Sequence, residues 1–183
     1  HPMLNHSVDE AAGCVTRVRN AIGDDIDLMV DLDSQDDPDA ALHIAKLITP
    51  ERPYWFEEPV DGDDIKALAK IREATGLKVV TGEKQSGLSH FRAVLATGAA
   101  DILNPDIAGI GGLLDILEVA GLADLQGVKV SPHCWNSMTV AAEAMLHVCA
   151  SIPNAEIAEI YPEYIPHGEK FALKAFHLEG EDA

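Results

Sequence analysis

Three acidic residues recur at an even interval in the first half of the sequence, and each follows a short apolar run. They are Asp31, Glu57 and Glu83. Carboxylates that meet at one point repel one another unless a cation balances their charge. Oxygen ligands suit a hard divalent ion, Mg²⁺ above all, and leave coordination positions for water and a substrate. We therefore predict a Mg²⁺ site formed by these three carboxylates.

Three more polar residues continue the series toward the C-terminus, namely Asp106, His133 and Glu159. An aspartate that binds a histidine orients the imidazole and raises its basicity. We expect His133 to act as the base or acid and Asp106 to orient it. A base, an acid and a metal around one pocket suit removal of the proton α to a carboxylate, with the metal stabilising the resulting ene-diolate.

The elements that position these residues follow from the spacing. The six polar residues recur every 23 to 27 positions, which is room for a strand, a loop and a helix of three or four turns. The apolar runs predict six strands, at 28–30, 54–56, 79–82, 102–105, 128–132 and 157–158. Helical patterns lie before and between them, at 8–22, 38–48, 65–76, 86–97, 112–125 and 137–151. Strands that alternate with helices predict a parallel sheet with right-handed crossovers.

Two α/β architectures fit this order, an open doubly wound sheet and a (β/α)8 TIM barrel. The open sheet would concentrate its function at one switch point, but no Gly-x-Gly-x-x-Gly motif follows a predicted strand. A polar residue at the end of each strand favours the barrel, whose active site collects at that face. We therefore predict that residues 1–183 are one partial barrel domain with about six of the eight strand-helix units.

A closed barrel has eight strands and about 250 residues. Six strands would leave two open edges, which proteins avoid. We therefore expect two strands ahead of His1, outside this chain, and we expect copies of the protein to associate as a homo-oligomer.

The charge of the chain limits its partners. It has 13 Lys and Arg against 31 Asp and Glu, a net charge of −18, which disfavours nucleic acid and anionic membrane surfaces. No apolar stretch reaches the length that spans a bilayer, and no signal peptide follows His1. Three cysteines without a Cys-x-x-Cys spacing indicate reduced thiols. We expect a cytoplasmic enzyme with a small-molecule substrate.

Five motifs in a fixed order resemble the enolase superfamily and, within it, the mandelate racemase subgroup. The motifs are Val30-Asp31, Trp55-Phe56-Glu57-Glu58-Pro59, Gly82-Glu83, Asn104-Pro105-Asp106 followed by Gly111-Gly112, and Pro132-His133. The resemblance is specific because all five occur in order at the correct spacing.

The resemblance implies that the three predicted metal ligands lie on the third to fifth strands of the barrel, and that the His-Asp dyad lies on the next two. It implies that Glu159, on the eighth strand, hydrogen-bonds the substrate carboxylate. It also implies a small α+β capping domain and a second strand that carries a lysine. We expect both to lie N-terminal to this chain.

Two residues depart from the pattern of the subgroup. Members often carry Asn two residues after the first ligand, and some sugar-acid dehydratases carry His, whereas this chain has Asp33. Asp33 has three possible roles: partner of a metal ligand, contact to the substrate, or general acid. Lys84, after Glu83, is a candidate contact for a substrate carboxylate. We predict that Glu58 is a salt-bridge partner and not a metal ligand.

Together these features predict Mg²⁺-dependent dehydration of an aldonic or aldaric acid, because one histidine can serve both proton steps. Asp33 and Lys84 suit a polyhydroxy substrate. A racemase or epimerase and a lactone cycloisomerase share the same first half-reaction and remain alternatives within the subgroup. A non-catalytic fragment or structural paralogue is the alternative from another class.

Overall fold

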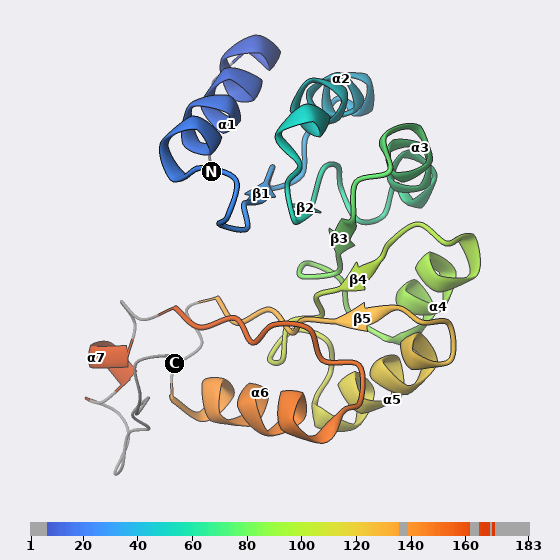
Figure 1. Ribbon diagram of the computed structural model, residues 1–183. Helices are drawn as coiled ribbons and strands as arrows, with labels where there is room; N and C mark the ends of the chain where they lie inside the picture. The colour runs from blue at the N-terminus through green and yellow to red at the C-terminus, as the bar shows by residue number, and fades with distance from the viewer. Residues whose placement is uncertain (1–6, 136–138, 162–164, 169, 171–183) are drawn as a thin grey trace.

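The computed structural model describes residues 7–135, 139–161, 165–168 and 170. Strands alternate with helices along this part of the chain (Figure 1). In chain order the elements are α1 (Val8–Ile22), β1 (Met29–Asp31), α2 (Pro38–Ile48), the 3-10 helix η1 (Thr49–Glu51), β2 (Trp55–Glu57), α3 (Ile65–Thr75), β3 (Val79–Thr81), α4 (Leu88–Thr97), β4 (Ile102–Leu103), α5 (Leu113–Asp124), β5 (Lys129–Val130), α6 (Thr139–Ser151) and α7 (Ile165–Gly168).

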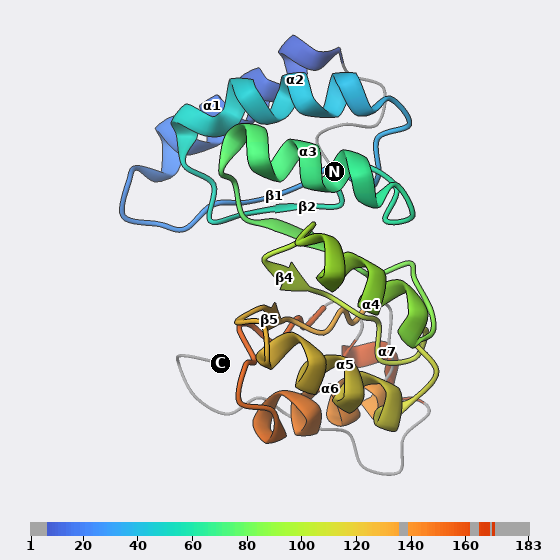
Figure 2. The same ribbon diagram turned by 90° about the vertical axis from the view of Figure 1, so that its right-hand side faces the viewer.

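The five strands form one parallel sheet in the order β1-β2-β3-β4-β5, so each strand pairs with the next strand in the sequence. Asp31 of β1 is in register with Glu57 of β2, which brings the ends of the two strands level. Helices α1 to α6 form an arc along the outer side of the sheet, and the carboxyl ends of the strands share one face (Figures 1 and 2). The prediction of a partial α/β barrel is confirmed.

The predicted sixth strand, at 157–158, is wrong. The chain runs beside β5 only as an isolated bridge between Val130 and Ala155, where the Glu156 N–H donates to the Val130 carbonyl oxygen at 3.0 Å. One step further, the Ser131 hydroxyl donates to the Ile157 carbonyl oxygen at 2.7 Å. The next ladder bond would run from the N–H of residue 132 to the Glu156 carbonyl oxygen, but Pro132 has no N–H, so the strand does not extend.

Local signals fix most of the helix ends. Ser7 begins α1 with a capping box that includes Glu10, and Asp37 caps α2 ahead of Pro38. Helix α4 begins at Leu88, two residues later than predicted, because Gly87 precedes it at φ 76° and donates its N–H to the Ile110 carbonyl oxygen. The predicted start of the last long helix, at 137, lies outside the described residues.

The sheet is packed on both faces. Between the sheet and the helices lie fully buried side chains such as Phe56, Phe91 and Ile116. On the inner face, Trp55, Val80 and Ile102 form a second, smaller cluster. Adjacent residues of β2 therefore point to opposite faces, as a strand requires, and Glu57 points inward with Trp55.

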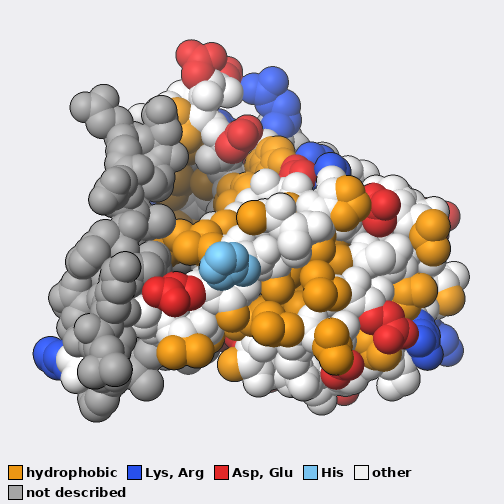
Figure 3. Space-filling view, turned by 90° about the horizontal axis from the view of Figure 1, so that it is seen from below, with side chains coloured by type: hydrophobic (Ala, Val, Ile, Leu, Met, Phe, Trp, Pro, Cys, Tyr) orange, Lys and Arg blue, Asp and Glu red, His pale blue; other side chains and the backbone are white. Residues whose placement is uncertain are grey.

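Among the described residues, no helix combines the length and apolarity needed to cross a bilayer. The outer surface of α5 and α6, on the side viewed in Figure 3, nevertheless exposes large apolar side chains. Leu114 is 82% exposed and Val140 is 80% exposed. Association between copies of the protein stays a prediction.

Gly82 gives a test of how the fold sets the end of β3. Its φ is +133°, and a Cβ atom there would lie 2.7 Å from Cε1 of the buried Phe91 ring. We expect Gly82→Ala to lower the free energy of unfolding by about 2–4 kcal/mol, because backbone strain adds to overpacking of the core. Urea denaturation measures the loss.

Gly76→Ala is the matched control. Gly76 has φ +68°, but nothing lies within 4 Å of the added Cβ, so only backbone strain of about 1 kcal/mol applies. Equal losses in the two variants would contradict the role of Phe91.

Candidate active site

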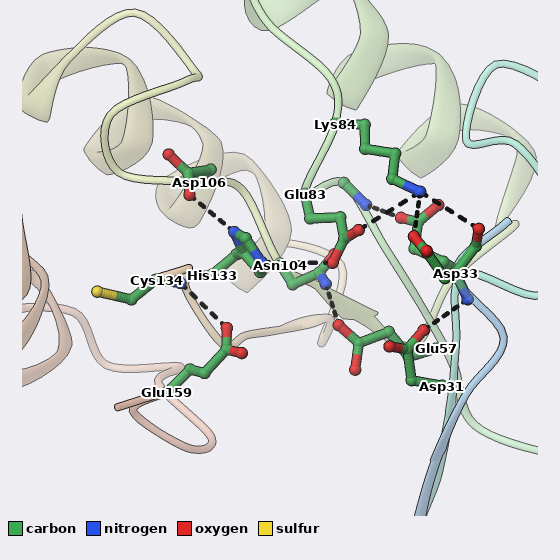
Figure 4. A network of polar contacts seen from close by, with 12 residues as sticks. Asp31, Asp33, Glu57, Glu83, Lys84, Asn104, Asp106, His133, Cys134 and Glu159 are labelled. Atoms are coloured by element: carbon green, nitrogen blue, oxygen red, sulfur yellow. Dashed lines mark hydrogen bonds and ion pairs between the residues drawn. The ribbon is translucent and has the colours of Figure 1, made fainter. Parts of the chain in front are cut away.

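The predicted site residues meet at the carboxyl ends of the strands. They surround a pocket of about 420 Å³ that is lined by Asp31, Asp33, Glu57, Glu83, Lys84, His133, Trp135 and Glu159. Seven of the eight predicted residues line the pocket. The eighth, Asp106, lies behind His133 and contacts its ring (Figure 4).

Strand ends position the three predicted metal ligands. Asp31 and Glu57 are the last residues of β1 and β2, and Glu83 follows β3 after Gly82. The Asp33 N–H donates to Asp31 Oδ1 at 2.7 Å, and the Asn104 amide donates to Glu57 Oε1 at 2.7 Å (Figure 4). Each of these two carboxylates thus has one oxygen fixed by a neighbour.

Burial and mutual repulsion raise the pKa of all three carboxyls. The pKa of Glu57 rises to about 8, first because burial penalises its charged form and then because Asp31, Glu83 and Glu159 lie near. Burial is also the largest cause of the raised pKa of Asp31 and of Glu83. A divalent cation would remove this penalty. The donor set therefore fits Mg²⁺.

The three carboxylates have suitable chemistry for Mg²⁺, but their side chains are not placed to bind one ion together as they stand. Among the residues that the structure describes, no three His, Cys, Asp or Glu side chains are arranged to hold a metal ion as they stand. The carboxylates share one pocket, but they would have to turn toward an ion to ligate it.

His133 and Asp106 form the predicted dyad. His133 Nδ1 lies 2.7 Å from Asp106 Oδ2, and the backbone N–H groups of Ala108 and Gly109 donate to Asp106 Oδ1, both at 2.8 Å. Nε2, the other ring nitrogen, faces Glu83 Oε2 at 3.5 Å. The aspartate is thus fixed from behind, and it presents the free side of the imidazole to the carboxylates.

The dyad shifts the pKa of both partners. Burial alone would lower the pKa of His133, but the hydrogen bond to Asp106 and the charges of Glu159 and Glu83 outweigh it and raise that pKa. Burial alone would raise the pKa of Asp106, but the bond to His133 and the backbone N–H groups lower it. The pair therefore favours an imidazolium beside a carboxylate.

Glu159 completes the pocket wall next to His133. The Cys134 N–H donates to Glu159 Oε2 at 3.0 Å (Figure 4). Nearby Glu156 does not line the pocket, because it accepts a hydrogen bond from the Tyr54 hydroxyl and lies 4.0 Å from Lys129 Nζ.

Asp33 and Lys84 form an ion pair at the rim of the pocket. Lys84 Nζ lies 2.6 Å from Asp33 Oδ1 and 3.7 Å from Glu83 Oε1. Asp33 and Ser34 have positive φ angles of 51° and 64°, so the turn after β1 is strained where it meets Lys84.

The predicted salt bridge of Glu58 is wrong. Glu58 is fully buried, and its carboxylate accepts hydrogen bonds from the Thr81 hydroxyl and the Gly82 N–H, both at 2.8 Å, and from the Ser34 hydroxyl at 3.3 Å. Burial, only partly offset by these bonds, raises its pKa to about 7. Glu58 therefore ties the turn after β1 to the end of β3, directly behind the predicted ligands.

Sequence reasoning also gave no role to Asn104, which orients Glu57. Its position directly after β4, two residues before Asp106, is the signal that could have placed it at the pocket.

Removal of the Asp106 charge tests the dyad. We expect Asp106→Asn to lower the pKa of His133, because the hydrogen bond is the largest cause that raises it. A raised folded-state pKa means that protonation of His133 stabilises the fold below about pH 6.5. That contribution is lost as the pH rises through the folded value.

The variant should therefore lose more stability at pH 6 than at pH 9, by about 1–3 kcal/mol at the lower pH. NMR titration of the His133 ring and urea denaturation of metal-free protein measure the two effects. Asp124→Asn, on the exposed side of α5, is the control. A His133 pKa that does not change in Asp106→Asn would contradict the assignment.

Comparison with known proteins gives one consistent family. The family described as enolase C-terminal domain-like matches residues 3–181. D-gluconate dehydratase of Thermoproteus tenax is 32% identical over 97% of this chain, and D-galactarolactone cycloisomerase of Agrobacterium fabrum is 33% identical over 82% of it. The chain spans only 37% and 40% of the length of these two relatives.

Solved structures agree with the fold. An enolase from environmental shotgun sequencing of the Sargasso Sea has a TM-score of 0.87 and 51% identity, over 92% of this chain and 45% of that one. L-talarate dehydratase of Polaromonas sp. JS666, solved with Mg and L-glucarate, has a TM-score of 0.78 and 28% identity, over 87% of this chain and 43% of that one.

Proposed function

The chain belongs to the enolase superfamily, in the mandelate racemase group, and on that premise we propose that it dehydrates a sugar acid with the help of Mg²⁺. One observation carries the proposal. The His133–Asp106 dyad faces Asp31, Glu57 and Glu83 across a single pocket. The protein thus holds a proton-transfer group beside a cluster of anionic oxygens that calls for a cation.

Asp31, Glu57 and Glu83 would hold the metal. Bound Mg²⁺ would supply positive charge that stabilises the substrate carboxylate as its α-proton leaves. Residues of this chain would carry out the proton transfers themselves. Two structures of relatives support the metal, the L-talarate dehydratase with Mg and a Streptomyces coelicolor racemase with bound magnesium.

His133 would take the α-proton on Nε2 while Nδ1–H stays bonded to Asp106. The pair of electrons left on the α-carbon then forms a double bond to the β-carbon. As the β-hydroxyl leaves, His133 returns the proton to it and water departs. One residue thus serves both steps, and the enol that remains rearranges to a 2-keto-3-deoxy acid.

Glu159 would hold the substrate carboxylate from the side opposite the metal ligands. A carboxylic acid that carries its proton can donate its O–H to a carboxylate oxygen. The Cys134 N–H fixes Glu159 Oε2 beside His133, so the substrate carboxylate and the base would lie next to each other.

A second candidate is cycloisomerisation of a sugar-acid lactone. The 33% identical D-galactarolactone cycloisomerase favours it. Dehydration is nevertheless favoured by D-gluconate and D-galactonate dehydratases, which match this chain at 30–32% identity. A screen of sugar acids and their lactones with the full-length protein and Mg²⁺ separates the two activities.

Glu57 tests the metal site. We expect Glu57→Gln to remove most Mg²⁺ binding, because it loses one of three anionic ligands. In the unsubstituted protein, affinity should rise between pH 6 and pH 8, because a carboxyl whose pKa is about 8 must release its proton when the ion binds. Calorimetry in buffers of different ionisation enthalpy measures the Mg²⁺ affinity and the number of protons released on binding.

Glu118→Gln, on the exposed side of α5, controls for the loss of a surface charge. Unchanged Mg²⁺ affinity in Glu57→Gln would contradict the assignment of Glu57 as a metal ligand.

His133 tests the base. In the full-length protein, His133→Asn should reduce turnover by on the order of 10² to 10⁴, the usual size of a general acid–base contribution. Transfer of deuterium from D₂O to the α-carbon of recovered substrate should be lost with it. The Mg²⁺ affinity should remain that of the unsubstituted protein, since His133 lies across the pocket from Asp31 and Glu57.

His147→Asn, on the exposed side of α6, is the control and should leave exchange unchanged. If His133→Asn exchanges deuterium normally, another residue is the base.

A further inference from the structure

We infer that the Asp33–Lys84 ion pair makes this pocket select sugar acids with one carboxylate over those with two. The inference rests on the dehydration of sugar acids proposed above and names the class of acid. It concerns the end of the substrate far from the reacting carbon, where an aldonic acid has a neutral hydroxymethyl group and an aldaric acid has a second carboxylate.

The donors of Lys84 are already engaged. Its Nζ lies 2.6 Å from Asp33 Oδ1, 3.1 Å from Ser34 Oγ and 3.4 Å from the Asp33 carbonyl oxygen. An ammonium group has three N–H donors, and these three acceptors match them in number. A second substrate carboxylate would have to displace Asp33 before it could bind Lys84.

The charge around the pocket also opposes a second anion. The described residues that line it include five carboxylates but only one lysine and one histidine. Once the reacting carboxylate is bound, negative charges outnumber positive ones, even with Mg²⁺ bound, His133 protonated and Glu159 neutral. The reacting carboxylate can approach the metal, but a second one would meet the Asp33 carboxylate at the rim.

The same pair suits hydroxyl groups. Asp33 and Lys84 are 36% and 43% exposed at the pocket wall. Lys84 binds Oδ1 of Asp33, so Oδ2 can accept a hydrogen bond from a substrate hydroxyl. The Ser34 hydroxyl lies next to Lys84 Nζ. A polyhydroxy chain with an uncharged end fits these groups. The geometry therefore favours an aldonic acid.

Matched pairs of acids test the inference. Gluconate and glucarate, or galactonate and galactarate, share chain length and configuration and differ only in the far end. With the full-length protein and Mg²⁺, we expect kcat/KM to be at least about tenfold higher for the monocarboxylate, the discrimination expected when a charged group meets an unpaired like charge.

The two partners of the ion pair should act in opposite directions. Asp33→Asn frees Lys84, so the ratio of kcat/KM for dicarboxylate over monocarboxylate should rise by about tenfold. Lys84→Gln leaves Asp33 unpaired, so the same ratio should fall. Lys70→Gln breaks an exposed ion pair with Asp39, away from the residues that line the pocket, and should leave the ratio within about twofold. A merely structural pair would lower activity on both acids alike and leave the ratio unchanged.

Calorimetric binding of the same acids to Mg²⁺-loaded protein separates this inference from the proposed function. If no acid is turned over but the monocarboxylate still binds tighter, dehydration is wrong and the selectivity stands. Equal binding of both acids, or an unchanged ratio in Asp33→Asn, overturns the selectivity whether or not the enzyme is a dehydratase.

Discussion

Crowded negative charge at the carboxyl ends of the strands is the constraint on which the rest of the site depends. Asp31, Glu57 and Glu83 enter one pocket from three neighbouring elements, and burial with mutual repulsion raises the pKa of each. Such a cluster is stable only beside positive charge or in a partly protonated form. The chain supplies positive charge at two edges of the cluster, through Lys84 and His133, and the proposed Mg²⁺ would supply it at the centre.

The backbone around the cluster departs from regular geometry so that it can hold these side chains. Asp33, Ser34 and Glu58 have positive φ angles, each at a cost of about 1–3 kcal/mol. The Glu58 carboxylate offsets part of that cost by its hydrogen bonds to Ser34, Thr81 and the Gly82 N–H. The strained turns and the buried Glu58 therefore act together, and they fix the backbone positions of Asp31 and Glu83.

Features with local signals could be predicted from the sequence. Helices α1 and α2 have the predicted bounds because Ser7, Asp37 and Pro38 mark their starts. The three predicted metal ligands could be found because each follows a short apolar run. Contacts between strands gave no such signal. Pro132 stops the sixth strand because, in the register formed with β5, it stands where the ladder needs an N–H donor. The roles of Asn104 and Glu58 depend on partners that lie 23 or more residues away.

The predicted metal ligands and the His133–Asp106 dyad lie on two walls of the pocket, and one sheet positions both walls. The three predicted metal ligands come from the ends of β1 to β3, and the dyad comes from the ends of β4 and β5, where Asp106 and His133 pair as a parallel bridge. Asn104, next to β4, donates to Glu57 across this division, and Glu83 faces His133 Nε2 at 3.5 Å. The distance between His133 and the anionic wall is thus set by strand pairing. For the proton transfer that we propose, a group positioned in this way needs little reorganisation, and pre-organised electrostatics of this kind supply the largest share of many enzymatic rate enhancements.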